Sequence, residues 1–158
     1  MSGNRPSNAT GHFVWNILEI HSYLETIHKA WAELLGISEP QWLILMAIDE
    51  LDKGEGVSGV DVSAKLRVHP AFVTTQTKSL ERAGLLARNP SPNDARFVLM
   101  SLTPKARGEI AKLSDRREAL HASLFGALGA DVLTDLNSRL DVIRKAAERA
   151  TRQLALDL

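Results

Sequence analysis

Residues 79–108 read SLERAGLLARNPSPNDARFVLMSLTPKARG, and in this segment two short apolar runs flank a loop of turn-forming residues. The runs are residues 85–88 and 97–102, and the loop between them contains two prolines and two asparagines. Strand-like runs around such a loop predict a β-hairpin. Asp94 and Arg96 lie where the loop leads into the second strand. A carboxylate at this spacing can accept a hydrogen bond from the arginine and so orient it.

The residues before this hairpin have helical patterns with recognisable starts. Ser38 begins a capping box, in which Gln41 is the third helical residue, and this predicts a helix to about Leu51. A second capping-box candidate at Ser58 opens a short helix to about residue 67. Pro70 suits the first turn of a further helix, which ends at residue 84. Two helices joined by a short bend and followed by a hairpin form a winged helix-turn-helix.

Long helices are expected at both ends of the chain. Residues 12–35 have an apolar seam at spacings of three and four, from Phe13 to Leu34. A helix is predicted from Pro104 to about residue 128. The residues GAD at 129–131 break it, and a last helix follows. The expected fold is mainly α with a small β-hairpin wing (α+β). We expect a flexible tail at 1–11 and one domain at 12–158. In this domain, dimerisation helices at 12–36 and 104–158 flank a winged helix-turn-helix at 38–103.

Composition limits the classes of protein to which the chain can belong. Its 158 residues suit a single domain, and the absence of cysteine excludes disulfides and thiolate metal sites. No apolar run approaches the roughly 20 residues of a membrane span, and the first eleven residues do not resemble a signal peptide. We therefore expect a cytoplasmic protein with no membrane partner and no cofactor.

The formal net charge of zero conceals an uneven distribution. Residues 1–56 have a net charge of −5 and residues 57–107 a net charge of +5, whereas residues 108–158 are balanced. A basic middle segment in a neutral protein indicates a local surface for a polyanion.

The helix that begins at Pro70 has two distinct faces. Helical spacing places Val73, Thr77 and Leu80 on the inner face. The opposite face combines small side chains with basic ones, which suits the major groove of DNA, where bulk is excluded and donors meet phosphates and base edges. These residues are Ala71, Thr74, Thr75, Lys78 and Arg82. Arg96, at the exit of the hairpin loop, can reach a neighbouring minor groove.

With these features, the sequence resembles the MarR family of transcriptional regulators. The resemblance rests on a run of residues in 79–108: Leu80, Glu81, Gly84, Leu85, Arg88, Asp94, Arg96, Leu102, Thr103 and Gly108. It implies a homodimer with Arg96 in the minor groove. From the basic segment and the two helical arms we expect this dimer to bind an inverted-repeat operator in double-stranded DNA, with Arg88 and Asp94 also in the interface. Three departures are that Thr75 stands where the family often has arginine, that His69-Pro70 replaces a more usual Ser or Asp cap, and that the oxidant-sensing cysteine of some relatives is absent.

The resemblance also implies regulation by a ligand, since many members are repressors released by small aromatic or phenolic acids. A site of this kind needs flat apolar walls and a few polar groups. Trp15 and Trp42 are the candidate walls, and His12 and Asn16 lie within one helical turn of Trp15.

Two alternatives to a ligand-responsive DNA-binding regulator remain open. One is a metal-sensing member of the same family, because His21, Glu25 and His28 share one face of a helix. The other is a winged-helix module that binds proteins and not DNA. No arrangement of residues predicts catalysis, so the chain is not expected to be an enzyme.

Overall fold

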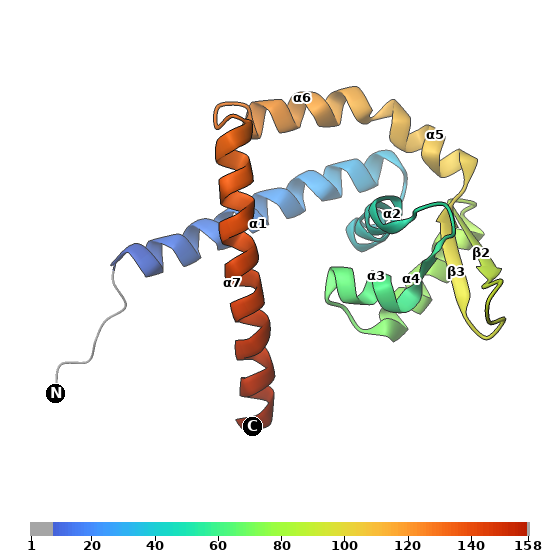
Figure 1. Cartoon of the computed structure of the whole chain (residues 1–158). Coiled ribbons are helices and arrows are strands. Elements are labelled where there is room, and N and C mark those ends of the chain that lie inside the picture. Colours follow the sequence, from blue (N-terminus) through green and yellow to red (C-terminus); the bar gives the residue numbers. More distant parts are fainter. Residues whose placement is uncertain (1–7, 158) are drawn as a thin grey trace. The chain divides into compact units, whose positions relative to one another are not determined.

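The computed structural model describes residues 8–157, which fall into two compact units that meet between residues 110 and 111. The first unit contains seven elements and the start of an eighth (Figure 1). These are α1 (Asn8–Leu34), α2 (Glu39–Leu51), β1 (Val57–Ser58), α3 (Gly59–Leu66), α4 (Pro70–Arg82), β2 (Leu86–Pro90) and β3 (Val98–Leu102), followed by α5 (Pro104–Lys112), which ends in the second unit. The second unit continues with α6 (Ser114–Phe125) and α7 (Ala130–Asp157).

Helix α2 is the centre of the first unit and packs against α1, α3, α4 and β3. It is buried on most of its circumference, and its fully or nearly fully buried residues are Trp42, Ile44, Leu45, Ala47 and Ile48. The predicted capping box begins this helix. The Ser38 side chain accepts from the Gln41 N–H, and the Gln41 side chain accepts from the Ser38 N–H at 3.1 Å. A helix that is apolar on nearly all sides must be covered by its neighbours, so α2 organises the whole unit.

The sheet has three antiparallel strands in the order β1-β3-β2, one more than the sequence predicted. The hairpin pairs Leu86 with Leu102 and Pro90 with Val98. The additional strand β1 pairs Val57 with Met100 across the other edge of β3. The tip of the hairpin projects beyond the helices as the wing (Figure 1).

A tight turn after α2 places β1 beside β3. The Asp52 carboxylate accepts from the N–H of Gly54 at 2.8 Å and of Gly56 at 2.9 Å. Gly56 has φ +84, and a Cβ there would lie 3.0 Å from Leu99 Cβ. Only glycine meets both demands, because it tolerates positive φ and leaves room for a close approach of strands. The strand itself is too short for a periodicity signal, which is why it was not predicted.

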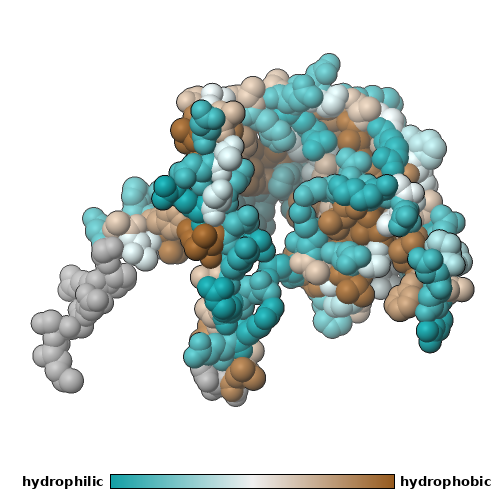
Figure 2. Space-filling view, in the orientation of Figure 1, coloured by the Kyte–Doolittle hydropathy of each residue, from teal (hydrophilic) through white to brown (hydrophobic). Residues whose placement is uncertain are grey.

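Helix α1 begins at Asn8, so residues 8–11 are helical and the predicted start at residue 12 was wrong. The remainder of the expected tail, residues 1–7, lies outside the described residues. The predicted apolar seam of α1 is half-buried at Leu24, Ile27 and Trp31 but exposed nearer the N-terminus. Figure 2 shows hydrophobic residues at the surface there. This stripe needs a further partner.

The helix expected from Pro104 to residue 128 is two helices. Helix α5 ends at Lys112 and α6 begins at Ser114, with Leu113 between them at φ −94 and ψ −8. Helix α6 ends at Phe125, and Gly129 at φ +74 makes the turn into α7. In α7 the predicted apolar stripe includes Leu136, Leu140 and Ile143, which are exposed. Among residues 8–157 no helix combines the length and apolar character that a membrane crossing requires.

Candidate nucleic-acid interface

The turn between α3 and α4 sets the position of α4. Arg67 adopts a left-handed conformation with φ 55 and ends α3, and the Ser63 hydroxyl donates to the Val68 carbonyl at 3.0 Å. His69 then caps α4, because its Nδ1 atom accepts from the Ala71 N–H at 3.1 Å. Pro70 follows in the first turn, where its missing N–H leaves no helical bond unmade.

The C-terminal end of α4 is held by the start of α5. Gly84 at φ +74 closes a Schellman motif, in which the Leu85 N–H donates to the Leu80 carbonyl at 3.0 Å. The Thr103 hydroxyl donates to the Gly84 carbonyl at 2.7 Å, and Lys105 Nζ donates to the Ala83 carbonyl at 2.9 Å. Helix α4 is therefore fixed at both ends by side chains from outside it.

The two predicted faces of α4 are confirmed. Val73, Thr77 and Leu80 are each 1% exposed. The opposite face is exposed at every predicted position: Ala71, Thr74, Thr75, Lys78 and Arg82. The exposed hydroxyls donate back to the helix, Thr74 to the Pro70 carbonyl at 3.1 Å and Thr75 to the Ala71 carbonyl at 3.0 Å. Each hydroxyl oxygen retains acceptor capacity, which suits amino groups at the edges of bases.

The wing places Arg96 on an exposed tip in a defined orientation. Arg96 Nε donates to Asp94 Oδ1 at 3.0 Å, and Nη2 donates to Asp94 Oδ2 at 2.7 Å. The Arg96 N–H also donates to Asp94 Oδ1 at 3.0 Å. The loop is closed by the Ser91 N–H, which donates to the Phe97 carbonyl at 2.7 Å. The orienting hydrogen bond that the sequence predicted is therefore present in a two-pronged form.

The charges of this pair reinforce each other. Hydrogen bonds from the Arg96 side chain and backbone lower the pKa of Asp94 below its ordinary value, and the same carboxylate raises the pKa of Arg96. Both groups are therefore charged at neutral pH. The Arg96 side chain is 86% exposed, so its remaining donors are open to a partner.

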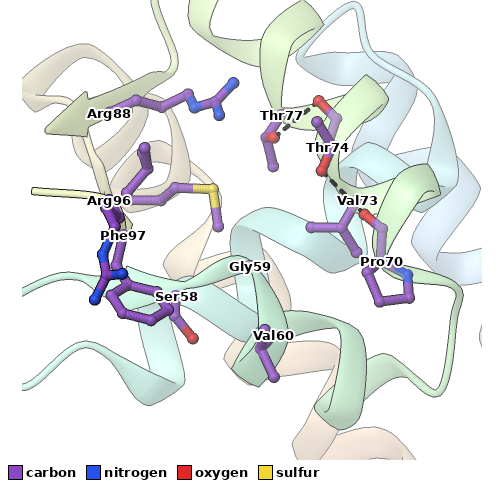
Figure 3. Close-up of a pocket in the computed structure, with 12 residues that line it drawn as sticks. Ser58, Gly59, Val60, Pro70, Val73, Thr74, Thr77, Arg88, Arg96 and Phe97 are labelled. Carbon is purple, nitrogen blue, oxygen red and sulfur yellow. Dashed lines mark hydrogen bonds between the residues drawn. The ribbon is translucent and has the colours of Figure 1, made fainter. Parts of the chain in front are cut away.

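Arg88, the third basic element of the predicted interface, is placed differently from Arg96. It lies in β2 opposite Met100, and its side chain is only 20% exposed. Its Nη1 atom is 4.0 Å from Glu81 Oε2 of α4, a separation that gives an ion pair but not a hydrogen bond. Arg88 thus extends across the space between β2 and α4 and does not reach the tip of the wing (Figure 3).

A hollow of about 270 Å³ joins α4 to the wing, and residues from both line it (Figure 3). Its lining includes Thr74 from α4 and both Arg88 and Arg96 from the wing. These three predicted residues therefore share one face of the unit. The hollow also includes residues that the sequence did not assign to the DNA interface, namely Ser58, Val60, Pro70, Phe97 and Val98. Phe97 follows Arg96 directly and is 57% exposed. A search of the sequence for an aromatic residue next to a basic one in the hairpin loop would have found it.

The four predicted ligand-binding residues do not form one site within the chain. Trp42 is 1% exposed and belongs to the core, in the first turn of α2. Trp15 is 65% exposed and lies 19 residues before the end of α1, which is about 28 Å along a helix axis. His12 and Asn16 are exposed like Trp15. Ligand binding by His12, Trp15, Asn16 and Trp42 therefore stays a prediction.

The structure gives no support to a metal site at the first helix. His21 Nε2 lies 3.7 Å from Glu25 Oε1, and both side chains are more than half exposed. Among residues 8–157 no three histidine or acidic side chains are grouped so that they could hold a metal ion.

Taken together, these elements define a winged helix-turn-helix with a basic recognition helix and an arginine-tipped wing. Residues 37–98 match the sequence model of the MarR family. The resemblance inferred from the residues of 79–108 is thereby confirmed over the helix-turn-helix and most of the wing.

Individual relatives agree with this assignment. An HTH-type transcriptional regulator of Bacillus subtilis strain 168, YwhA, is 27% identical over 88 residues, which are 56% of this chain and 61% of that protein. The matching region thus covers less than two thirds of its length. CouR from Rhodococcus jostii RHA1, bound to p-coumaroyl-CoA, is similar in structure with a TM-score of 0.74 at 20% identity, over 87% of this chain and 95% of CouR.

A MarR variant from E. coli in complex with operator DNA has a TM-score of 0.68 at 22% identity, over 89% of this chain and 99% of that one. At such identities the two structural likenesses establish the fold. Of these relatives, YwhA is described as a transcriptional regulator.

Proposed function

We propose that this protein is a dimeric, sequence-specific DNA-binding transcriptional regulator of the cytoplasm that acts as a repressor. The observation that carries the proposal is the hollow lined jointly by Thr74 of α4 and Arg96 of the wing. Because the hollow lies between the two elements, the exposed face of α4 and the wing lie on one side of the unit, which allows a single partner to contact both. A duplex presents a major groove to such a helix and an adjacent minor groove to the wing.

The electrostatics of this surface support DNA as the partner. The exposed face of α4 carries Lys78 and Arg82, and the wing carries Arg88 and Arg96. Glu81 and Asp94, the acids beside them, are each paired with one of these arginines. A solvated helix with no partner would more often carry free acids on such a face.

Self-association is supported by the apolar stripes that the single chain leaves exposed. In α1 these include Phe13 and Ile17, which are 42% and 39% exposed, and in α7 Leu140 and Ile143, at 45% and 41%. Contiguous apolar stripes of this kind mark association surfaces. A second copy of the chain would place two recognition helices side by side, as an inverted repeat requires.

We expect selection from a random pool of duplexes to recover an inverted repeat. A dimer with two-fold symmetry reads two half-sites whose centres lie about one helical turn, roughly 34 Å, apart. Sequencing of the bound duplexes, with the dimer measured by light scattering at the same concentration, checks both parts. Recovery of single, unpaired half-sites would contradict the dimeric mode of binding.

We further propose that a small aromatic acid lowers the affinity for DNA by binding at the exposed part of α1 around Trp15, His12 and Asn16. One structural relative is bound to p-coumaroyl-CoA, whose acyl group is aromatic. For such a ligand to act, it must bind the DNA-free arrangement better than the DNA-bound one. DNA must then weaken the binding of the ligand by the same factor.

Fluorescence titration of the protein with a panel of aromatic carboxylates tests this mechanism. The expected result is quenching that is weaker in the presence of the selected duplex and that is lost in Trp15→Phe. Trp42 is buried, so its emission should change little and serves as an internal reference. A ligand that quenched Trp15 equally in free and DNA-bound protein would exclude the mechanism.

A further inference from the structure

The hollow between α4 and the wing has a chemical character that groove contacts alone do not explain. Its floor and sides include apolar groups from Val60, Val73 and Met100, whereas Arg88 and Arg96 supply positive charge. Figure 3 shows Arg96 and Phe97 on the wing side and Thr74 and Pro70 on the α4 side, with the start of α3 between them. An apolar surface beside two guanidinium groups fits a ligand that is apolar on one side and anionic on the other.

A duplex bound in the proposed way has such a group at this place. Helix α4 in the major groove and Arg96 in the adjacent minor groove are separated by the single sugar–phosphate strand that divides the two grooves. That strand must cross between α4 and the wing. Its deoxyribose presents a largely apolar face, and its phosphate is an anion that a guanidinium can bind in a forked geometry.

We propose that this hollow seats one sugar–phosphate unit of the strand between the two grooves, and that Arg88 donates to its phosphate. The proposal rests on the function proposed above. Arg96 extends from the tip of the wing and is held by Asp94. Arg88 is largely enclosed between β2 and α4, and among residues 8–157 the ion pair found for it is the 4.0 Å contact with Glu81. A phosphate can take the place of that carboxylate without breaking a hydrogen bond.

The two arginines then have separable roles. A phosphate contact positions the protein but reads no sequence, so Arg88 contributes equally to all duplexes. Glu81 competes with the phosphate for Arg88. Its removal should therefore strengthen binding to every duplex, because Arg88 is freed and a negative charge beside the strand is lost.

The test combines Arg88→Met with duplexes in which single phosphates are replaced by neutral methylphosphonates, one position at a time. For the unaltered protein, a methylphosphonate at the linkage between the two contacted grooves should clearly lower the affinity. For Arg88→Met, the same substitution in the DNA should cause no further loss. The variant should bind selected and scrambled duplexes more weakly by the same factor, and its salt slope should fall in magnitude by about 1. Glu81→Gln should bind both duplexes more tightly.

Lys65→Met is the matched control, since it also removes one positive charge, but Lys65 lies outside the hollow and is paired with Glu50 at 2.7 Å. It should leave the methylphosphonate profile unchanged. Arg88→Lys keeps the charge and provides a second variant if Arg88→Met does not fold. It should retain the salt slope but lose part of the penalty at the critical linkage, because an ammonium lacks the forked donor geometry.

The outcomes separate this proposal from the function on which it rests. If the loss of affinity at this linkage persisted in Arg88→Met, or if Glu81→Gln bound DNA more weakly, the proposed sugar–phosphate site would be wrong. Duplex binding by the unaltered protein would still support the proposed function. Absence of duplex binding by the unaltered protein would instead overturn the function itself.

Discussion

Leu80→Ala is expected to lower the free energy of unfolding by about 2–5 kcal/mol, the cost of emptying a fully packed leucine site. Leu80 is 1% exposed on the inner face of α4. Its carbonyl also accepts from the Leu85 N–H at the end of the helix. Loss of the side chain therefore removes core packing at the point where α4 meets the sheet. Urea denaturation of both proteins at the same protein concentration measures the effect, because the apparent stability of a dimer depends on concentration.

Lys78→Ala and Thr74→Ala are the controls for this prediction. Both residues lie on the exposed face of α4. The free energy of unfolding of each variant should therefore lie within about 0.5 kcal/mol of that of the unaltered protein. Both should nevertheless bind DNA more weakly. A Lys78→Ala variant that unfolded readily and bound DNA with unchanged affinity would show that the assignment of the two faces is wrong.

Arg96→Ala is expected to weaken binding to the selected duplex by about 1–3 kcal/mol, with little change in stability. The side chain is 86% exposed and is paired with Asp94 at the wing tip, so its removal leaves the core intact. Equilibrium titration of labelled duplex, together with a thermal melt of each variant, separates loss of binding from loss of folding.

Asp94→Ala should weaken binding in the same direction, although it removes a negative charge near DNA. The reason is that the Asp94 carboxylate accepts two side-chain donors and one backbone donor of Arg96, which fixes the approach of the guanidinium. Electrostatics without orientation predicts tighter binding, the result expected for Glu81→Gln. Tighter binding by Asp94→Ala would refute the orienting role.

Much of the fold follows from local signals in the sequence. The capping residues Ser38 and Ser58 act at the predicted helix starts, and the period of α4 separates Leu80 from Lys78 correctly. These features depend on residues within one or two helical turns. The same holds for the Asp94–Arg96 pair, whose members are two residues apart.

The features that the sequence did not reveal depend on distant partners. Strand β1 is two residues long and exists because Val57 pairs with Met100, more than 40 residues later. The helix break at Leu113 could not be predicted, because no glycine or proline lies beside it in the sequence. Arg88 was expected in the DNA interface, but its place between β2 and α4 follows from the register of the hairpin. Trp42 is an aromatic residue of the kind that lines ligand pockets, and only tertiary packing shows that it belongs to the core.

The most direct measurement of the central claim is the salt dependence of binding to the selected duplex and to a scrambled duplex of equal length. If the basic face of α4 and the wing bind DNA, the logarithm of each association constant should fall linearly with the logarithm of salt concentration, with a slope of about −0.9 per phosphate neutralised. The selected duplex should bind tighter by about 10³-fold or more. Affinities that stayed constant from low to moderate salt, or that were equal for the two duplexes, would contradict sequence-specific DNA binding and favour a winged-helix module that binds proteins.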